Sequence, residues 1–273
     1  MQIVKAVILG IVQGITEFLP VSSSGHLVLA KHLLQLQEQG IEFEVFLHFG
    51  TLLAVLTVFR KDIMNLIAGF FSLFTPQFYH DGMQSRFRSD AYFRLLVFIV
   101  LASVPAGVVG LLFEDQIEAF FSQPRLTSIN LIITAVILTL TLLARKNSRE
   151  LSLKNTFIMG IAQAVAILPG ISRSGSTISA GLYQGVKSEE AARFSFLLAV
   201  PAILGATLLH ALKMIEAGFS GEQFMALAIG MAAAYLAGLL AIESMLALVR
   251  RGKLFYFAPY CLILGILGLL LIH

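Results

Sequence analysis

The sequence predicts an all-α polytopic membrane protein with six transmembrane helices and two re-entrant helix pairs, arranged as an inverted repeat. The first observation is composition: 58% of the 273 residues are hydrophobic and 13% are charged, whereas soluble chains are roughly 45–50% apolar and about 25% charged. The second is that apolar stretches of membrane-spanning length recur along the whole chain. The third is a pair of similar polar motifs about 150 residues apart.

The charge and cysteine content exclude several classes of protein. The formal net charge is +3, but the basic residues lie mostly in short loops, where they report membrane orientation. No basic stripe with interleaved aromatic residues is present, so nucleic acid is not an expected partner. The single cysteine, Cys261, excludes an internal disulfide and is expected to be a small packing residue.

Six apolar runs are long enough to span a bilayer. They cover approximately residues 43–59, 92–113, 126–144, 193–213, 223–249 and 255–272. Two further apolar regions, 3–36 and 155–186, are interrupted by polar residues, proline and glycine. Each half of these regions has only about 13–18 residues, which is marginal for a crossing. Because proline and glycine end one helix before another begins, we expect each region to form a helix pair.

Charged loops predict how these segments are oriented, because loops rich in Lys and Arg lie on the cytoplasmic side. The basic loops lie at 60–61, 86–94, 145–154 and 250–253, and the acidic ones at 114–118 and 214–222. With acidic loops outside, region 155–186 begins and ends inside, whereas region 3–36 begins and ends outside. Both regions are therefore predicted to be re-entrant, with both chain termini outside. Segment 63–79, between two basic loops, is predicted to be an amphipathic interfacial helix.

The chain is expected to form a single membrane domain, 1–273, with internal repeats of approximately 1–145 and 146–273. Five residues recur at a constant offset of 150. They are Gly10, Gln13, Ser22, Ser24 and Gly25, which match Gly160, Gln163, Ser172, Ser174 and Gly175. Inverted repeats with broken helices place a binding site near the bilayer midplane, where the two repeats meet.

The two polar motifs, Pro20–His26 (PVSSSGH) and Pro169–Thr177 (PGISRSGST), lie at the breaks of the helix pairs. A charge at the bilayer centre costs about 2.5–3.5 kcal/mol on insertion scales, so His26 and Arg173 there indicate a functional site. Each motif is expected to begin a helix, and helix N-termini bind anions. Two such termini meeting from opposite sides would suit a diphosphate. The alternative is that the serines only cap their helices.

Several other residues have more than one interpretation. Gln13 and Glu17 share a helix face, and Glu17 has three open roles: to orient His26, to hold a cation or to neutralise Arg173. His48 is expected either to line the cavity or to form a hydrogen bond within the bundle. On the first helix, Gly10 and Gly14 form a small-residue face that predicts close helix packing.

Gln13-x-x-x-Glu17 followed by the two motifs resembles the bacterial undecaprenyl-diphosphate phosphatase family of the bacitracin-resistance type, over the whole chain. The resemblance implies an integral enzyme of the bacterial cell (inner) membrane that hydrolyses undecaprenyl diphosphate to undecaprenyl phosphate and inorganic phosphate. The recycled carrier lipid would serve peptidoglycan synthesis. It also implies an active site open to the outer face, a divalent cation, membrane-lipid partners and a homodimer. The family allows Glu or Gln at the first acidic position, and this chain has Gln13, which offers a neutral carbonyl oxygen.

Roles follow for the candidate residues. The expected catalytic residues are Glu17, Ser22, Ser23, His26 and Arg173. The expected phosphate-binding residues are Ser24, Gly25, Ser172, Ser174, Gly175 and Thr177. Glu17 and Gln13 are expected to bind Mg²⁺ or Ca²⁺ through hard oxygen ligands. His26 would act as general base or acid. Either Ser22 or Ser23 attacks phosphorus while His26 takes its proton, or water attacks directly and the serines only bind phosphate.

A membrane transporter for an anion or a lipid phosphate is the competing interpretation. Inverted repeats, broken helices and an anion site at the midplane are typical of transporters. Transport needs no nucleophile, however, and the combination of His26, several serines and Arg173 favours bond cleavage.

Overall fold

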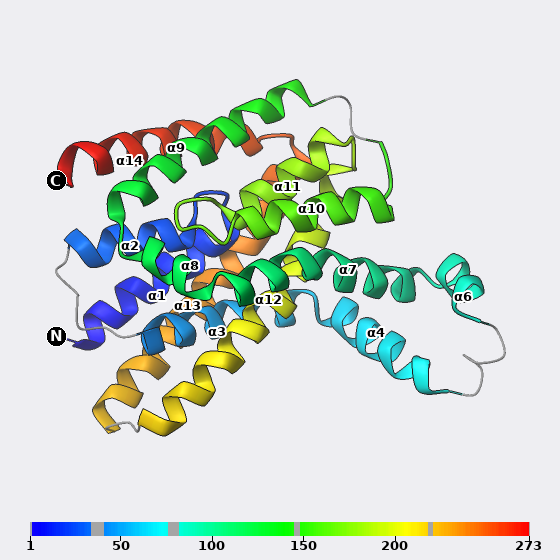
Figure 1. Cartoon of the computed structure of the whole chain (residues 1–273), viewed down its shortest axis with the longest axis horizontal. Coiled ribbons are helices and arrows are strands. Elements are labelled where there is room, and N and C mark those ends of the chain that lie inside the picture. The colour runs from blue at the N-terminus through cyan, green and yellow to red at the C-terminus, as the bar shows by residue number, and fades with distance from the viewer. Residues whose placement is uncertain (1, 34–40, 76–81, 145–147, 218–220, 273) are drawn as a thin grey trace.

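The computed structural model describes residues 2–33, 41–75, 82–144, 148–217 and 221–272 (Figure 1). Within these ranges the chain is helical, and the only β-type pairing is an isolated bridge between Arg149 and Val186. Every predicted apolar run forms a helix. These helices are α3 (Ile41–Val58), α7 (Ala91–Leu112), α9 (Pro124–Leu140), α12 (Ser188–Ala217), α13 (Gly221–Arg250) and α14 (Ala258–Leu271). Short 3₁₀ turns, η2 (Thr141–Leu143) and η3 (Leu254–Phe257), extend α9 and precede α14.

Among the described residues, five helical segments are long and apolar enough to cross a membrane: Ala91–Leu112, Pro124–Leu143, Ser188–Leu208, Phe224–Arg250 and Leu254–Leu271. The sixth predicted run contains the shorter apolar segment Val45–Val58 within α3. Large apolar side chains on these helices face outward, for example Leu111 and Leu240, which are each about 70% exposed. The chain is therefore an all-α, multi-pass membrane protein, as predicted.

The two interrupted regions form helix pairs. The first pair is α1 (Gln2–Phe18) and α2 (Ser23–Leu33), and the second is α10 (Leu153–Val165) and α11 (Arg173–Tyr183). An 11-residue helix such as α2 or α11 extends only about 16 Å, roughly half of the hydrocarbon thickness. This length fits the predicted re-entrant arrangement, in which the chain turns back at residues 19–22 and 166–172.

Short helices occupy the connections. A helix covers part of the segment predicted to be interfacial, as α4 (Arg60–Phe71) with the turn η1 (Ser72–Phe74). Residues 76–79 of that prediction lie outside the described residues, and the interfacial location stays a prediction. Its exposed face carries Met64, Ile67, Phe70, Phe71 and Phe74. Two further helices, α6 (Met83–Ser89) and α8 (Glu114–Phe121), lie where loops were expected. Acidic residues in the first turn of α8 stabilise its N-terminus.

Each helix pair packs on a helix from the other half of the chain. Helix α1 lies along α13, and α10 lies along α7, while α3 packs on α12 and α9 on α14. A twofold axis that relates the two halves of the chain would produce this pattern, in which these helices of one half pack on helices of the other half. The boundaries of the two repeats, 1–145 and 146–273, stay a prediction.

Close packing between α1 and α13 depends on glycine, as the small-residue face predicted. A Cβ atom added at Gly10 would meet the Gly230 carbonyl, and one added at Gly14 would lie 2.7 Å from the Ala237 Cβ. The corresponding helix pair repeats this contact, because a Cβ at Gly160 would meet the backbone of Ala102 in α7, 2.7 Å from its Cα. Two helix backbones thus approach each other where no side chain intervenes.

We expect Gly10→Leu to lower the thermal unfolding midpoint of the detergent-solubilised protein, since overpacking typically costs about 1–3 kcal/mol. Gly110→Leu is the matched control, because nothing lies within 4 Å of a Cβ at Gly110. Differential scanning fluorimetry of both variants measures the effect. Equal midpoints for the two variants would contradict the packing argument.

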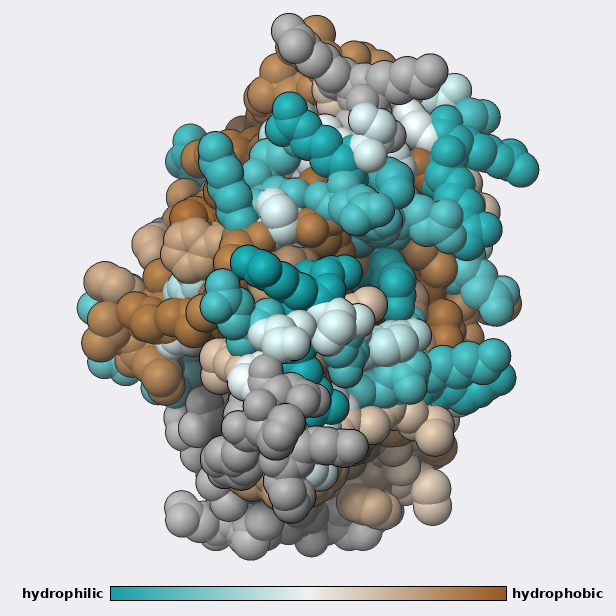
Figure 2. All heavy atoms as spheres, turned by 90° about the vertical axis from the view of Figure 1, so that its right-hand side faces the viewer, coloured by the Kyte–Doolittle hydropathy of each residue, from teal (hydrophilic) through white to brown (hydrophobic). Residues whose placement is uncertain are grey.

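Ion pairs join the loops that were predicted to share the cytoplasmic side. Arg193 of α12 pairs with Asp62 of α4, with its Nε 3.2 Å from Oδ2. Arg250 donates to Glu189 at 2.7 Å, and Lys187 Nζ lies 3.8 Å from Glu150 Oε1. Figure 2 shows hydrophilic side chains gathered on the corresponding end of the molecule. The basic loops therefore lie together at one end, as the charge pattern requires.

Candidate active site

The same cap begins the second helix of each pair. The Gly25 N–H donates to Ser22 Oγ at 3.2 Å, and the Gly175 N–H donates to Ser172 Oγ at 3.0 Å. In each motif the capping hydroxyl also lies beside the hydroxyl two residues later, at 3.2 Å for Ser22–Ser24 and 3.3 Å for the other pair. Ser22 and Ser172 are therefore helix caps, and their side chains form the same hydrogen bonds in both motifs.

The tips of the two helix pairs contact each other at the centre of the molecule (Figure 1). A Cβ atom at Gly25 would lie 3.1 Å from Gly170 Cα, and one at Gly175 would lie 3.2 Å from Pro20 Cβ. The two contacts are equivalent under the offset of 150 residues, because Gly25 corresponds to Gly175 and Pro20 corresponds to Gly170. Ser174 Oγ also donates to the Leu19 carbonyl at 3.1 Å. The predicted meeting of the two polar motifs is confirmed.

Glu17, at the end of α1, joins the two motifs chemically. Its side chain is only 6% exposed and forms an ion pair with Arg173, the first residue of α11. The other carboxylate oxygen, Oε2, accepts hydrogen bonds from Ser23 Oγ at 2.6 Å and Gln13 Nε2 at 2.8 Å. His48 Nε2 lies 3.7 Å from the same oxygen. Of the three roles left open for Glu17, the structure shows the ion pair with Arg173.

Arg173 has donor capacity that the ion pair does not use. Its Nη1 atom is buried and has no hydrogen-bond partner among the described residues. Buried polar groups are nearly always satisfied, so an orphaned guanidinium N–H calls for a ligand. An anion with several oxygens, such as phosphate, is the natural acceptor for a guanidinium fork.

A cavity of about 170 Å³ lies at this junction. One part of its wall is polar and comes from α1, both motifs and α3. This part comprises Thr16, Glu17, Ser22, Ser23, Ser24, His48, Ser172 and Arg173. The other part is apolar and comprises Phe121 of α8, Ala166, Ile167 and Ile171. A cavity with one polar side and one apolar side suits an amphiphile, whose polar head group would face the polar residues.

Half of the predicted site residues line this cavity and half lie behind it. Those that line it are Glu17, Ser22, Ser23, Ser24, Ser172 and Arg173. Gln13 supports Glu17 from behind, and Gly25 and Gly175 permit the close contact between the tips. Thr177, expected to bind phosphate, is buried, and its hydroxyl lies 2.6 Å from Ser195 Oγ of α12. That hydroxyl therefore braces α11 against α12.

His26 also lies outside the cavity lining. Its Nδ1 is 2.7 Å from the Ser22 carbonyl oxygen, and its Nε2 is 2.6 Å from the Tyr260 hydroxyl. The expectation that His26 takes the proton of a serine is not supported by this arrangement. The Ser23 hydroxyl is bonded to Glu17, so the carboxylate is the base within reach.

A polar face of α9, which was not predicted from the sequence, holds the second tip. Asn130 Nδ2 donates to the Pro169 carbonyl at 2.7 Å, and Thr134 Oγ1 donates to the Gly170 carbonyl at 2.8 Å. The Ser172 N–H donates in turn to Thr134 Oγ1 at 3.0 Å. The signal was available, because polar residues at helical spacing within an apolar run must share one buried face.

We expect Thr134→Val to destabilise the second tip, because it leaves the Gly170 carbonyl and the Ser172 N–H without partners. Each such buried group costs about 1–3 kcal/mol. The thermal unfolding midpoint of the detergent-solubilised protein measures the effect. Thr139→Val is the control on the same helix, since the exposed Thr139 hydroxyl bonds only to its own helix at Ala135. Equal behaviour of the two variants would contradict the role of Thr134.

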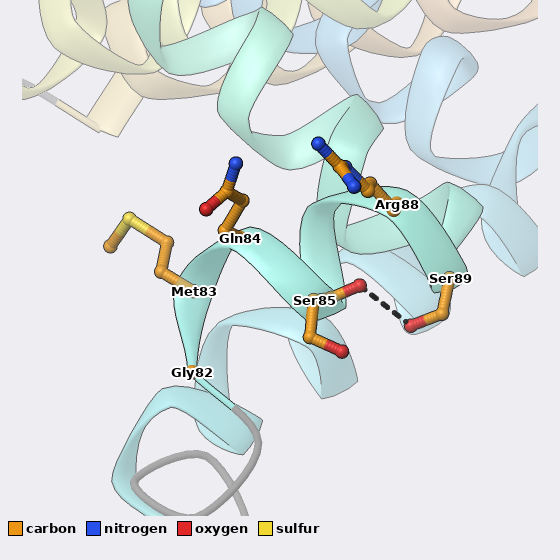
Figure 3. A pocket seen from close by; sticks show the side chains of 6 residues that line it. All are labelled: Gly82, Met83, Gln84, Ser85, Arg88 and Ser89. Atoms are coloured by element: carbon orange, nitrogen blue, oxygen red, sulfur yellow. Dashed lines mark hydrogen bonds between the residues drawn. The ribbon is translucent and has the colours of Figure 1, made fainter.

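A larger hollow of about 810 Å³ lies beside α6, at the hydrophilic end of the molecule (Figure 3). It is open to the surface and is lined by Gly82, Met83, Gln84, Ser85, Arg88 and Ser89. All of these are exposed, and none belongs to the paired motifs. The smaller cavity, with its buried carboxylate and guanidinium, is therefore the candidate active site.

The oxygen ligands that the site offers a metal ion are few. Among the described residues, no group of three His, Cys, Asp or Glu side chains could hold a metal. Gln13 Oε1, however, is buried beside Glu17 and has no partner in the part of the chain that the structure describes. Mg²⁺ commonly binds one or two carboxylates and takes its other ligands from water and substrate phosphates, so the Glu17 carboxylate and Gln13 Oε1 are the candidate oxygen ligands among the predicted site residues.

Comparisons with known proteins point to one family. The model of the family described as bacitracin resistance protein BacA matches residues 6–267. A protein of Salinibacter ruber called undecaprenyl-diphosphatase is 46% identical over 98% of this chain and 98% of its own length. Proteins of the same name from Methanobrevibacter smithii and, numbered 1, from Bacillus licheniformis are 46% and 40% identical, each over at least 96% of both chains.

Proposed function

The chain belongs to the bacitracin resistance protein BacA family, and from this we propose an integral-membrane phosphatase that hydrolyses undecaprenyl diphosphate to undecaprenyl phosphate and inorganic phosphate. The names of its relatives favour this activity over the transporter alternative. The observation that carries the proposal is that Ser23 and Arg173 both contact Glu17, which places a hydroxyl, a carboxylate and a guanidinium side chain in the wall of one cavity. In the cell, the product would re-enter peptidoglycan synthesis as carrier lipid.

Binding begins at Arg173 and the N-terminus of α11. The terminal phosphate accepts hydrogen bonds from Nη1, and the helix terminus adds favourable electrostatic potential. The phosphate then competes with Glu17 for the guanidinium.

The chemical step uses Ser23 as the nucleophile. Its hydroxyl proton passes to Glu17 Oε2 over the existing 2.6 Å hydrogen bond, while Oγ forms a bond to the terminal phosphorus. The bond from phosphorus to the bridging oxygen breaks, and undecaprenyl phosphate leaves with the electron pair. Water then hydrolyses the phosphoserine, and the proton on Glu17 returns to Ser23. Direct attack by water is the competing route.

For the cofactor we propose Mg²⁺ or Ca²⁺, held by the Glu17 carboxylate and Gln13 Oε1. A bound cation would neutralise charge on the phosphoryl oxygens. We expect EDTA to lower phosphate release by at least about tenfold, with recovery on adding Mg²⁺ or Ca²⁺. Gln13→Ala should raise the cation concentration needed for half-maximal activity. Full activity of the EDTA-treated protein would exclude this role.

For localisation we propose the bacterial cell (inner) membrane, with the cavity open to the outer face and both termini outside. The single native cysteine, Cys261, is buried, so we expect it to react little with thiol reagents, and labelling then reports on the introduced cysteine. An impermeant thiol reagent applied to intact cells should label Asp115→Cys in the acidic loop and spare Arg251→Cys. The reverse pattern would invert the topology. A homodimer stays a prediction from the family resemblance.

The direct test is phosphate release from undecaprenyl diphosphate by the purified protein in detergent. We expect release that is absent from a mock purification and dependent on protein concentration. A protein that releases no phosphate with or without divalent cations, but moves phosphate across vesicle membranes, would overturn the enzyme proposal and support the transporter alternative.

A further inference from the structure

Ser22 is strained, and it directly precedes the nucleophile. Its φ of 67° lies in the left-handed region, and it is the only described residue other than glycine with a positive φ. A residue with a side chain rarely adopts such a conformation and keeps it only where its surroundings impose it. The corresponding turn of the second motif places its left-handed conformation at a glycine, Gly170.

His26 holds this strained turn through the Ser22 carbonyl. That oxygen accepts two hydrogen bonds from His26, one from the backbone N–H at 3.1 Å and one from the ring Nδ1 at 2.7 Å. Because a carbonyl only accepts, Nδ1 carries a proton. The ring is therefore used as a donor to the backbone beside Ser23, and this side of it does not face the substrate cavity.

Tyr260, at the start of α14, locks the ring in place. Its hydroxyl lies 2.6 Å from His26 Nε2, and the two rings lie nearly parallel, with an interplanar angle of 4° and centroids 5.6 Å apart. In neutral histidine Nε2 is the acceptor, so the hydroxyl donates. The next residue, Cys261, approaches the Pro20 carbonyl at 3.6 Å. The start of α14 thus contacts the first tip at two residues, Pro20 and His26.

We infer that His26 and Tyr260 form a brace that holds the strained Ser22 turn and so aims the Ser23 hydroxyl at Glu17. Both are positioning residues: Tyr260 fixes the ring, the ring fixes the Ser22 carbonyl, and that carbonyl fixes the backbone that carries Ser23. This inference rests on the proposed function and assigns His26 a role other than general acid or base. A nucleophile misplaced by 1 Å costs about 10²-fold in rate.

The decisive comparison is His26→Asn against His26→Ala. An asparagine amide N–H can donate to the Ser22 carbonyl in place of Nδ1, but it cannot act as acid or base at neutral pH. We expect His26→Ala to lower kcat by about 10²-fold, and His26→Asn to recover most of that loss. KM should change little, because neither group lines the cavity. An asparagine variant as inactive as the alanine variant would overturn the inference and support proton transfer by His26.

A second comparison tests Tyr260. Tyr260→Phe keeps the stacked ring and removes only the hydroxyl, so we expect a smaller fall in kcat, about five- to tenfold, at unchanged KM. Combining it with His26→Ala should add no further loss, because the hydroxyl acts through the ring. Tyr256→Phe is the control, since Tyr256 is exposed in η3. Additive losses in the double variant would contradict a brace.

The two proposals fail in different ways. If the wild-type protein releases no phosphate, the proposed function fails and the brace has no reaction to serve. If the wild type is active and Tyr260→Phe matches it in kcat, only the brace is excluded. Thermal midpoints of all variants, measured in the same detergent, separate loss of positioning from loss of fold.

Discussion

Arg173→Ala is expected to lower kcat/KM for phosphate release by about 10³-fold or more, the range found when an arginine that stabilises phosphoryl transfer is lost. The substitution removes the guanidinium that pairs with Glu17. It also removes Nη1, which has no hydrogen-bond partner among the described residues and is proposed to donate to the phosphate. Arg173→Lys should be intermediate, because lysine keeps the charge but cannot present two parallel N–H groups. Steady-state phosphate release over a range of substrate concentrations measures both variants.

Folding must be checked alongside activity. Removing one partner of a buried ion pair leaves the other charge uncompensated, at a cost of about 3–5 kcal/mol. Arg173→Lys keeps a positive charge beside Glu17 and so tests the chemistry in a folded protein. Arg250→Ala is the control, since Arg250 pairs with Glu189 on the surface and both side chains are 59% exposed. An Arg173→Lys variant with wild-type kcat would refute bidentate phosphate binding.

Ser23→Ala is expected to reduce turnover by about 10³-fold or more, because it removes the hydroxyl that attacks phosphorus in the covalent route. In the wild type, acid quenching during turnover with substrate labelled in the terminal phosphate should leave label on the protein. Peptide mapping should place it at Ser23. Ser244→Ala is the matched control, because its exposed hydroxyl bonds only within α13, to Leu240.

The covalent and direct routes give opposite results in this experiment. If water attacks directly, Ser23→Ala retains near-normal turnover and no label is trapped on the wild type. Glu17→Gln does not distinguish the covalent route from direct attack by water, because both routes need a base and both should lose activity. Its expected effect is nevertheless severe, since the carboxylate that accepts from Ser23 becomes a neutral amide.

The spans were predictable because hydrophobicity is a local property of the chain. Each apolar run formed a helix in its expected place, and the breaks at Pro20 and Pro169 formed turns between paired helices. Helix α8 was not predicted, because its eight residues read as an acidic loop. Its Phe121 nevertheless forms part of the cavity wall.

The site was predictable as far as the repeated motifs reach. Matching motifs implied two tips that meet, and Ser23 of one motif and Arg173 of the other do both contact Glu17. What spacing cannot show is which distant side chain braces a tip. Tyr260 lies 234 residues from His26, and Thr134 lies 36 from Gly170. In an apolar helix a lone hydroxyl has many possible partners, and only the tertiary fold selects one.

The contact between Glu17 and Arg173 spans 156 positions in the chain, which has a consequence for biogenesis. During synthesis the N-terminal hairpin enters the bilayer long before its cationic partner has left the ribosome. Until then Glu17 lacks its arginine partner, and we expect the unpaired hairpin to be less stable in the membrane. The first half of the polypeptide expressed alone should therefore be degraded rapidly, and co-expression of the second half should protect it.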